Sequence, residues 1–528
     1  MKAPHQEARV TAAEWRWVFV FALAVMTFTL VPYLAAWSAA RDGWQFGGFL
    51  LAVEDGNAYL ARMGRGARGQ LLETLSFSTE PQRGTLLLPA LHLLGWLAGP
   101  DPRTELIAYH TTRVLSGIGL LAASYTFLAA FVISVTWRRV ALVLVALGGG
   151  LGWLIVVLVP GGAWLGSLPP DLILPEAFSF LVLFNFIHLA LARALLLLAL
   201  LAYLRGRGRL AGGLLLLAGL NQPLAIALAG ALMGLHATLG WLLRRRFSDW
   251  PWPRDLRTAM VAGLIAGPFL LYVTISLRLD PLLRQWMAQN ILSSPPPIHY
   301  LLAYAVLLLP AWSGLRALWG TAPRLAVLAA AWIVLALLLA YLPVPPQRRF
   351  LEGVQLPLAA LAALGLSQLA RPWRRPAAGL VLALSLPTTL LVWLGALGAA
   401  RLVQPPIFRP PDELAAFAWL RANAHLGDAG LAAYATGNAL PAYTPLSAYV
   451  GHGPETVFLA DKLLRVFVFY AAATPDSDRR ALLNEAGIDY VLFGPNERAL
   501  GDFDPSTADY LAERFTSGRY AVYAVLAP

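Results

Sequence analysis

The chain has 528 residues, of which 58% are hydrophobic and 13% are charged, and its mean hydropathy is +0.62. A soluble domain has about 25% charged residues, so this composition excludes an ordinary water-soluble protein. The net charge of +11 comes from arginines that cluster at the ends of apolar segments, which indicates membrane topology and argues against binding to nucleic acid. Cysteine is absent, so disulfides and thiolate metal sites are excluded.

Apolar segments that could cross a bilayer recur along most of the chain. A spanning helix needs about 20 apolar residues. The first segment, residues 15–37, is too long and has the wrong flanks for a cleaved signal peptide, so we expect it to be retained. The pattern predicts a polytopic α-helical membrane protein with about 11 spans. The expected spans are residues 15–37, 107–136, 140–159, 178–204, 210–243 (two spans divided at 221–223), 258–277, 300–318, 325–342, 354–370 and 378–400.

Residues 85–98 are apolar but number only about 14, which favours an interfacial or re-entrant helix over a span. If the amino terminus is cytoplasmic and this stretch does not span, the arginine clusters at the ends of the spans all lie in the cytoplasm. These clusters are at residues 138–139, 205–209, 244–246 and 371–375. An odd number of spans then places the carboxy-terminal region outside. Because the dominance of alanine, leucine and arginine is typical of a GC-rich bacterial source, we expect a multi-pass protein of a bacterial inner membrane.

The composition changes near residue 404. We expect a membrane module over residues 1–403, with its first outside loop at 38–105, a proline-rich linker at 404–411 and an extracytoplasmic α/β domain at 412–528. Within that domain, the patterns predict helices at 412–423, 455–472 and 478–485 and strands at 431–436, 490–493 and 520–525.

Two adjacent carboxylates, Glu54 and Asp55, stand in the loop after the first span. A carboxylate near the membrane surface can take the proton of an acceptor hydroxyl or hold a divalent cation. Because neighbouring carboxylates repel, one of them is favoured in its protonated form. The alternative interpretation is a solvated turn, since Glu-Asp-Gly-Asn is also a good turn sequence.

The order of motifs around this pair is informative. A long first span is followed by the acidic pair before Tyr59-Leu60, then by Thr79-Glu80-Pro81, a short apolar helix led by Gly84, and a span that opens with residues 109–113. This order resembles the GT-C superfamily of integral membrane glycosyltransferases, and most nearly the bacterial relatives of protein mannosyltransferases and lipid A aminoarabinose transferases. By pattern the resemblance covers residues 15–175, and by architecture it covers the whole chain.

The resemblance implies a membrane enzyme that takes a sugar from a polyprenyl-phosphate carrier. In that superfamily the first outside loop carries the catalytic carboxylate, and Asp55 is the matching position, with Glu54 beside it. The resemblance implies an acceptor that is a glycan, a lipid or a protein. The His-Pro-Pro or Lys-Pro-Pro of the superfamily is replaced here by Glu80-Pro81-Gln82, which leaves the acceptor class open.

Arg348 and Arg349 lie on the outside in the expected topology, where arginine is disfavoured. Guanidinium groups bind phosphate in bidentate fashion, so these residues are candidates for the phosphate of the donor. The alternative is that they extend to lipid headgroups. Glu352 is expected to orient Arg348, and Arg113, near the mouth of a span, is a further candidate phosphate contact.

Three more acidic residues, Asp171, Glu176 and Glu80, are candidates for binding the acceptor or a metal. Asp171 and Glu176 precede a span, and a plain loop with a glutamate at a helix start is their alternative interpretation. No cofactor is established by the sequence. A divalent cation, Mg²⁺ or Mn²⁺, is one candidate, and the metal ligands are unknown.

Two other classes of function remain open at this point. A lipid or sugar transporter (a flippase) would need polar residues spread through the spans and paired broken helices in two halves, of which the sequence shows one clear break. A non-catalytic membrane protein of envelope assembly would make no chemical use of Asp55, Arg348 or Arg349.

Overall fold

The structure is a computed structural model that describes residues 9–526. The chain divides into two compact units. Unit 1 consists of Met1–Val31, Thr112–Thr274 and Ile291–Gly395. Unit 2 consists of Pro32–Thr111, Ile275–Asn290 and Ala396–Pro528, and so combines the expected first outside loop with the expected carboxy-terminal domain. The proposed division of the chain at residues 404–411 stays a prediction.

Most of the chain is helical, because long apolar runs without water must satisfy their backbone hydrogen bonds internally. Within the described residues, eight helical segments are long and apolar enough to span a bilayer. They are α1 (Ala12–Ala39), α4 (Pro102–Phe131), α9 (Ile187–Leu204), α11 (Leu224–Leu242), α12 (Trp252–Leu279), α14 (Pro297–Thr321), the segment Gln347–Gln368, and α17 (Arg371–Ala399).

A ninth candidate span is bent by 42° and consists of α5 (Val135–Leu147) and α6 (Gly152–Leu158). The other two of the eleven expected spans correspond to α10 (Gly208–Asn221) and α15 (Pro323–Leu339), which are shorter. The chain is thus a polytopic α-helical membrane protein, as the composition indicated, and the number of spans stays a prediction.

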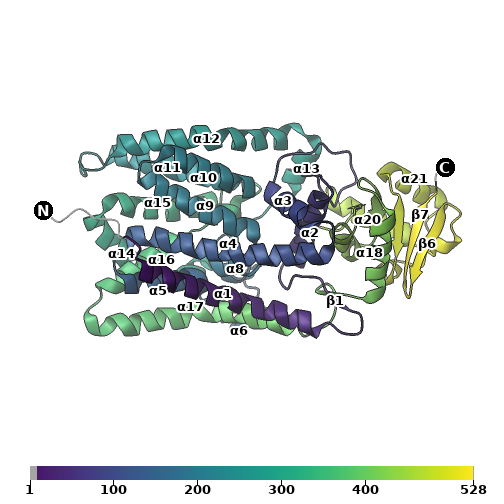
Figure 1. Cartoon of the computed structure of the whole chain (residues 1–528), viewed down its shortest axis with the longest axis horizontal. Coiled ribbons are helices and arrows are strands. Elements are labelled where there is room, and N and C mark those ends of the chain that lie inside the picture. Colours follow the sequence, from purple (N-terminus) through teal and green to yellow (C-terminus); the bar gives the residue numbers. More distant parts are fainter. Residues whose placement is uncertain (1–8, 527–528) are drawn as a thin grey trace. The chain divides into compact units, whose positions relative to one another are not determined.

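Unit 1 has a continuous apolar core that includes Leu142, Leu197 and Trp332. The helices α9, α10 and α11 lie side by side in this unit (Figure 1). The expected single span at residues 178–204 is divided at Phe186 into α8 (Ser179–Asn185) and α9. Two short segments complete unit 1: α7 (Pro170–Ile173) and the 3₁₀ helix η1 (Gln347–Leu351), which precedes α16 (Gln355–Gln368).

The first part of unit 2 holds two helices, α2 (Val53–Ala67) and α3 (Pro89–Ala98). At about 1.5 Å per residue, the ten residues of α3 extend about 15 Å, half the thickness of the hydrocarbon. This length agrees with the expectation that residues 85–98 do not span. Another short helix, α13 (Pro281–Gln289), follows α12.

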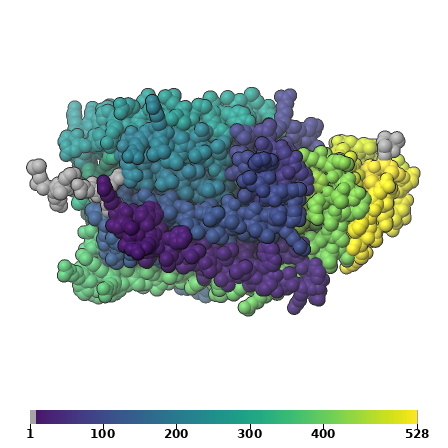
Figure 2. All heavy atoms as spheres, in the orientation of Figure 1, coloured from purple at the N-terminus to yellow at the C-terminus, as the bar shows by residue number. Residues whose placement is uncertain are grey.

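The carboxy-terminal part of unit 2 is an α/β arrangement around a five-stranded sheet with the order β4-β3-β5-β7-β6. The strands β4, β3 and β5 are parallel, and β7 is antiparallel to both β5 and β6. This last part of the chain, light green to yellow, fills one closely packed body in Figure 2. The strands are β3 (Ala429–Leu431), β4 (Ser447–Ala448), β5 (Tyr490–Phe493), β6 (Leu511–Ser517) and β7 (Tyr520–Val525).

The helices of this part are α18 (Pro411–Asn423), α19 (Tyr434–Tyr443), α20 (Leu459–Tyr470), α21 (Asp476–Ala486) and α22 (Pro495–Arg498), with a 3₁₀ turn η2 (Pro505–Thr507). Strand β2 (Phe408–Arg409) pairs instead with β1 (Gln45–Phe46) from the first loop. The expected strand at 431–436 is wrong: the strand ends at Leu431 and α19 begins at Tyr434, because this alanine-rich stretch favours helix over strand.

Candidate active site

Glu54 and Asp55 lie in the first turn of α2, so their interpretation as a solvated turn is wrong. The chain enters the helix through Ala52, whose φ of 47° is left-handed and unusual for a residue with a side chain. The first turn of a helix has unpaired N–H groups and a positive partial charge, both of which favour carboxylates. The local fold therefore places two negative charges where a helix stabilises them.

Asp55 contacts a histidine that is far away in the sequence. The distance between Nε2 of His452 and Oδ1 of Asp55 is 3.2 Å, and the Asp55 side chain is 44% exposed while His452 is buried. Burial acts to lower the pKa of His452, but the hydrogen bond to Asp55 and the charges of Glu455 and Asp55 outweigh it, so this pKa lies above its ordinary value. The contact orients the Asp55 carboxylate and leaves part of the group open to solvent.

Glu54 is held by a tyrosine from the same carboxy-terminal region. The hydroxyl of Tyr434 donates to Oε2 of Glu54 at 2.8 Å and accepts from the N–H of Gly453 at 2.9 Å. Burial and the hydrogen bond to Glu54 raise the pKa of Tyr434 above its ordinary value. Residues 451–456, which we call the clasp turn, therefore contact both carboxylates, Asp55 directly and Glu54 through Tyr434.

A buried ion cluster lies about two to three turns further along α2. Nε of Arg62 is 2.9 Å from Glu73, and its NH2 atom is 2.7 Å from Oε1 of Glu455 in the clasp turn. Burial raises the pKa of Glu73, although the charge of Arg62 acts against this. Arg65 donates to Ser76 and, across the unit, to Ser447 at 2.9 Å. This polar network fixes α2 against the carboxy-terminal part of unit 2.

Glu80, a candidate for acceptor or metal binding, is engaged by a cation. Its Oε1 lies 2.6 Å from Nζ of Lys462, whose side chain is buried and whose Nζ is also 4.9 Å from the centre of the Tyr449 ring. Burial lowers the pKa of Lys462, and the charge of Glu80 opposes this shift. The ion pair ties the first loop to α20.

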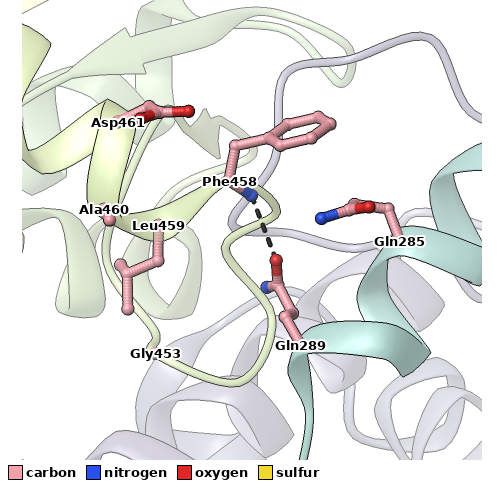
Figure 3. Close-up of a pocket in the computed structure, with 7 residues that line it drawn as sticks. All are labelled: Gln285, Gln289, Gly453, Phe458, Leu459, Ala460 and Asp461. Atoms are coloured by element: carbon pink, nitrogen blue, oxygen red, sulfur yellow. Dashed lines mark hydrogen bonds between the residues drawn. The ribbon is translucent and has the colours of Figure 1, made fainter.

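An open hollow of about 390 Å³ adjoins the clasp turn (Figure 3). Gln289, at the end of α13, spans one side of it: Nε2 donates to the carbonyl of Thr456 at 2.6 Å and Oε1 accepts from the N–H of Phe458 at 3.1 Å. The hollow is lined by Gln285, Gln289, Gly453, Phe458, Leu459, Ala460 and Asp461.

The remaining candidates belong to unit 1. Arg348 and Arg349 lie on η1, and Nε of Arg349 is 3.9 Å from Glu176, so these two candidates are neighbours. The Arg349 side chain is 40% exposed, as a phosphate contact would require. Glu352 does not orient Arg348, because it forms a buried ion pair with Arg193.

Arg113 and Asp171 are both buried among helices. NH1 of Arg113 donates to Oγ1 of Thr29 at 3.0 Å and to the carbonyl of Leu183 at 2.9 Å. Oδ2 of Asp171 accepts hydrogen bonds from the N–H groups of Gly150 and Gly152 and from the hydroxyl of Thr388. Asp171 thus satisfies the backbone at the bend between α5 and α6, a structural use of this carboxylate.

Residues 9–526 contain no group of three or more His, Asp or Glu side chains arranged to hold a metal ion. Of the candidate ligands, Glu80 is paired with Lys462 and Asp171 with backbone N–H groups. The candidate ligands that remain for Mg²⁺ or Mn²⁺ are therefore Glu54, Asp55 and Glu176, and metal dependence is decided by the chelator experiment proposed below.

Sequence reasoning missed Tyr434, Arg62, Glu455 and Arg193 as parts of these networks. The sequence could have indicated that Arg193 is paired, because an arginine in the middle of an apolar segment is costly without a partner. His452 is 397 positions from its partner Asp55, a separation that no local sequence pattern can bridge.

Comparison with solved structures identifies the fold. The apo oligosaccharyltransferase of Archaeoglobus fulgidus is 12% identical, with a TM-score of 0.56 over 94% of this chain and 72% of that chain. ArnT from Cupriavidus metallidurans bound to undecaprenyl phosphate is 15% identical, with a TM-score of 0.52 over 98% and 100%. The arabinofuranosyltransferase AftD from Mycobacteria is 17% identical, with a TM-score of 0.54 over 99% of this chain and 40% of that chain.

The architecture is therefore that of polytopic membrane glycosyltransferases. More particularly, the chain shares its fold with these three solved glycosyltransferases, which is the fold that the motif resemblance to the GT-C superfamily implied. No protein-family profile and no curated protein sequence matches the chain.

Proposed function

We propose that the protein is a membrane glycosyltransferase that moves a sugar from a polyprenyl-phosphate donor to the hydroxyl of an acceptor outside the bacterial inner membrane. The observation that carries this proposal is the half-exposed Asp55 carboxylate, held at a helix start by buried His452 in a GT-C fold. The ligands of two similar structures, undecaprenyl phosphate in ArnT and dolichol phosphate in the archaeal enzyme, support a lipid-linked donor.

In the proposed reaction Asp55 acts as the general base. Its carboxylate takes the proton of the acceptor hydroxyl while the hydroxyl oxygen attacks the anomeric carbon. The bond between that carbon and the phosphate oxygen breaks, and polyprenyl phosphate leaves with the electron pair. Because attack and departure occur on opposite faces in one step, the anomeric configuration inverts. His452 orients the base, and Glu54 adds negative charge beside it.

Arg348 and Arg349 are our candidates for holding the phosphate of the donor, with Arg113 as a third. A fixed guanidinium charge stabilises a phosphate leaving group. This role is separable from that of Asp55, because loss of a phosphate contact weakens binding of the carrier itself. Equilibrium binding of undecaprenyl phosphate to Arg348→Gln, Arg349→Gln and Arg113→Gln variants, measured against the wild type, tests it directly.

The central test is sugar transfer by the purified protein from a panel of polyprenyl-phosphate sugars. Asp55→Asn should abolish transfer while the protein stays folded, because an amide cannot accept the proton. Asp502→Asn removes an exposed carboxylate elsewhere in unit 2 and should leave transfer unchanged. Full activity in Asp55→Asn would refute the assignment of the base.

Two further arms of the same experiment separate the alternatives. Adding a chelator to half of the samples decides whether a divalent cation takes part. If the folded wild type binds polyprenyl phosphate but transfers nothing, the assay lacks the correct sugar or the correct acceptor. Failure both to bind and to transfer favours the transporter or the envelope-assembly interpretation.

A further inference from the structure

The helix α20 has an unusual surface for the extramembrane part of a protein. It packs one side into the core of the carboxy-terminal part through Val466, Phe469 and Tyr470, which are almost fully buried. The opposite side is exposed and also apolar. Its large members are Leu463, Leu464, Phe467 and Val468, exposed by 39%, 62%, 52% and 42%.

These exposed side chains form one continuous stripe. At 100° per residue, positions 460, 463, 464, 467 and 468 fall on the same side of the helix, opposite the buried positions 462, 466 and 469. Phe458, directly before the helix, adds an aromatic ring that is 47% exposed. The charged residues Asp461 and Arg465 lie on one flank between the stripe and the buried side, to which Lys462 belongs. An exposed apolar stripe of this size is typical of a helix surface that is covered by another apolar medium.

The stripe is held rigidly, so it cannot turn inward. The buried ion pair of Lys462 with Glu80 fixes one flank of the helix, and the hydroxyl of Tyr470 donates to the carbonyl of Leu492 at 2.7 Å. The residue before the helix, Phe458, is fixed through its N–H to Gln289. What covers the stripe must therefore come from outside this part of the chain.

The connections of α20 link it to the end of a candidate membrane span. Gln289 ends α13, which begins two residues after the spanning helix α12 ends at Leu279. The nine residues of α13 extend only about 13 Å. In the same unit, Ile275 and Leu279 at the end of α12 are exposed and apolar, as lipid-facing side chains are. The start of α20 thus lies within one short helix of the end of a membrane span.

We propose that the exposed stripe of α20, together with Phe458, lies in the headgroup and acyl boundary of the bilayer as an interfacial anchor. Amphipathic helices bind such boundaries by burying their apolar side about 5–10 Å into the lipid. The anchor would steady the clasp turn, because residues 451–456 lead directly into Phe458. Its partner is a lipid surface, and the inference does not depend on the proposed enzymatic activity.

The absence of native cysteine makes the test direct, since single cysteines can be introduced and labelled without background. Leu464→Cys, Phe467→Cys and Val468→Cys, each carrying a bimane fluorophore, are placed with the full chain in nanodiscs of phosphatidylcholine with or without bromine on the upper acyl chain. The control is Ser477→Cys on α21, an exposed position outside the stripe.

The expected result is loss of most of the fluorescence at 464, 467 and 468 in brominated lipid, with no change at 477. Quenching at the stripe equal to that at 477 would overturn the proposal. So would protection of the stripe from both bromine and aqueous iodide, because that result assigns it to a second copy of the chain or to another protein.

A measurement on the unmodified chain guards against labels that disturb the helix. Phosphatidylcholine with a diazirine near the headgroup is photoactivated around the wild-type protein, and tryptic peptides are analysed by mass spectrometry. Lipid adducts are expected on the peptides Leu463–Arg465 and Val466–Arg479, which contain the stripe. Adducts on the peptides of α12 together with none on these two peptides would contradict the anchor.

Discussion

The contact between Asp55 and His452 orients the carboxylate and raises the pKa of the imidazole. The imidazole is buried and the carboxylate is half exposed, so the hydrogen bond lies at the edge of the solvent. A protonated His452 fixes one oxygen of Asp55, and the negative charge of Asp55 in turn favours the protonated imidazole. The orientation of the proposed base therefore depends on His452, a residue that does not act on the acceptor in the proposed reaction.

We expect the stabilising effect of His452 to depend on pH. Because the pKa of His452 is raised in the folded protein, its charged form contributes fully below the ordinary value of about 6.5, and this contribution is lost as pH rises through the folded-state pKa. The midpoints of thermal unfolding of the wild type and of His452→Gln should differ most at low pH and converge as pH rises. At low pH the free energy of unfolding of the two proteins should differ by about 1 kcal/mol, since Asp55 is partly screened by water.

A wild-type advantage that grew with pH would contradict this assignment. Asp55→Asn serves as the companion variant, because it removes the partner charge and keeps the shape of the side chain. In that background the pH dependence caused by His452 should weaken.

The buried cation Arg62 makes a second prediction at the scale of residues. Arg62→Ala leaves Glu73 and Glu455 buried without their partner, which costs about 3–5 kcal/mol. Arg465→Ala breaks an exposed ion pair with Glu485 in the same unit and should cost about 0–1 kcal/mol. Urea unfolding monitored by tryptophan fluorescence measures both; equal effects of the two substitutions would show that the buried cluster is not a stabilising centre.

Some of the site was visible in the sequence and some was not. The acidic pair, Arg348 and Arg349 stood out because charges are rare in this chain. The partners Tyr434 and His452 could not be found, since a hydroxyl and an imidazole near glycines have many ordinary uses. The role expected for Glu352 was wrong because the nearer cation along the chain, Arg348, is not the nearer one in space.

At the scale of elements, the packing of α2 on α3 depends on two glycines. A Cβ on Gly66 would overlap the backbone of His92, and a Cβ on Gly95 would overlap the backbone of Met63. Side chains can move aside for a methyl group, but these backbone atoms cannot without separating the helices. The two glycines thus hold the helix of the acidic pair against its neighbour.

We expect Gly66→Ala and Gly95→Ala each to destabilise the protein by about 1–3 kcal/mol, because an overfilled contact forces backbone shifts. Gly119→Ala in α4 is the matched control, since its added methyl group would meet nothing within 4 Å. Thermal unfolding of the three purified variants checks this. A loss at position 119 as large as at 66 and 95 would point to a general effect of the substitution.

The elements themselves were predictable to different degrees. The strands β5 and β7 were predicted with their observed ends, because both are apolar runs bounded by turn residues. The sequence did not reveal β6, an edge strand whose Glu513 and Arg514 make it look like a loop. The expected helix at 455–472 begins only at Leu459, because residues 451–456 are used to hold α2.

At the scale of the molecule, the arginine clusters predict that the amino terminus is cytoplasmic and that unit 2 lies outside. Ser477→Cys should react with a membrane-impermeant maleimide in intact cells whose outer membrane is permeable to the reagent. Arg207→Cys, in an expected cytoplasmic cluster, should react only after lysis. The opposite pattern of labelling would invert the topology and remove the outside location of Asp55.

The contacts that complete unit 2 also have a consequence for how the protein is made. Asn57 bonds to Asn438, Arg62 to Glu455 and Arg65 to Ser447, and the first of these pairs is separated by 381 positions. In the predicted topology, the helix that carries Asp55 leaves the ribosome and crosses the membrane long before its partners are synthesised. Its two charged arginines stay solvated until the last quarter of the chain arrives. A chain truncated within that last quarter would keep its candidate spans but would lack the residues that hold the helix of Glu54 and Asp55 in position.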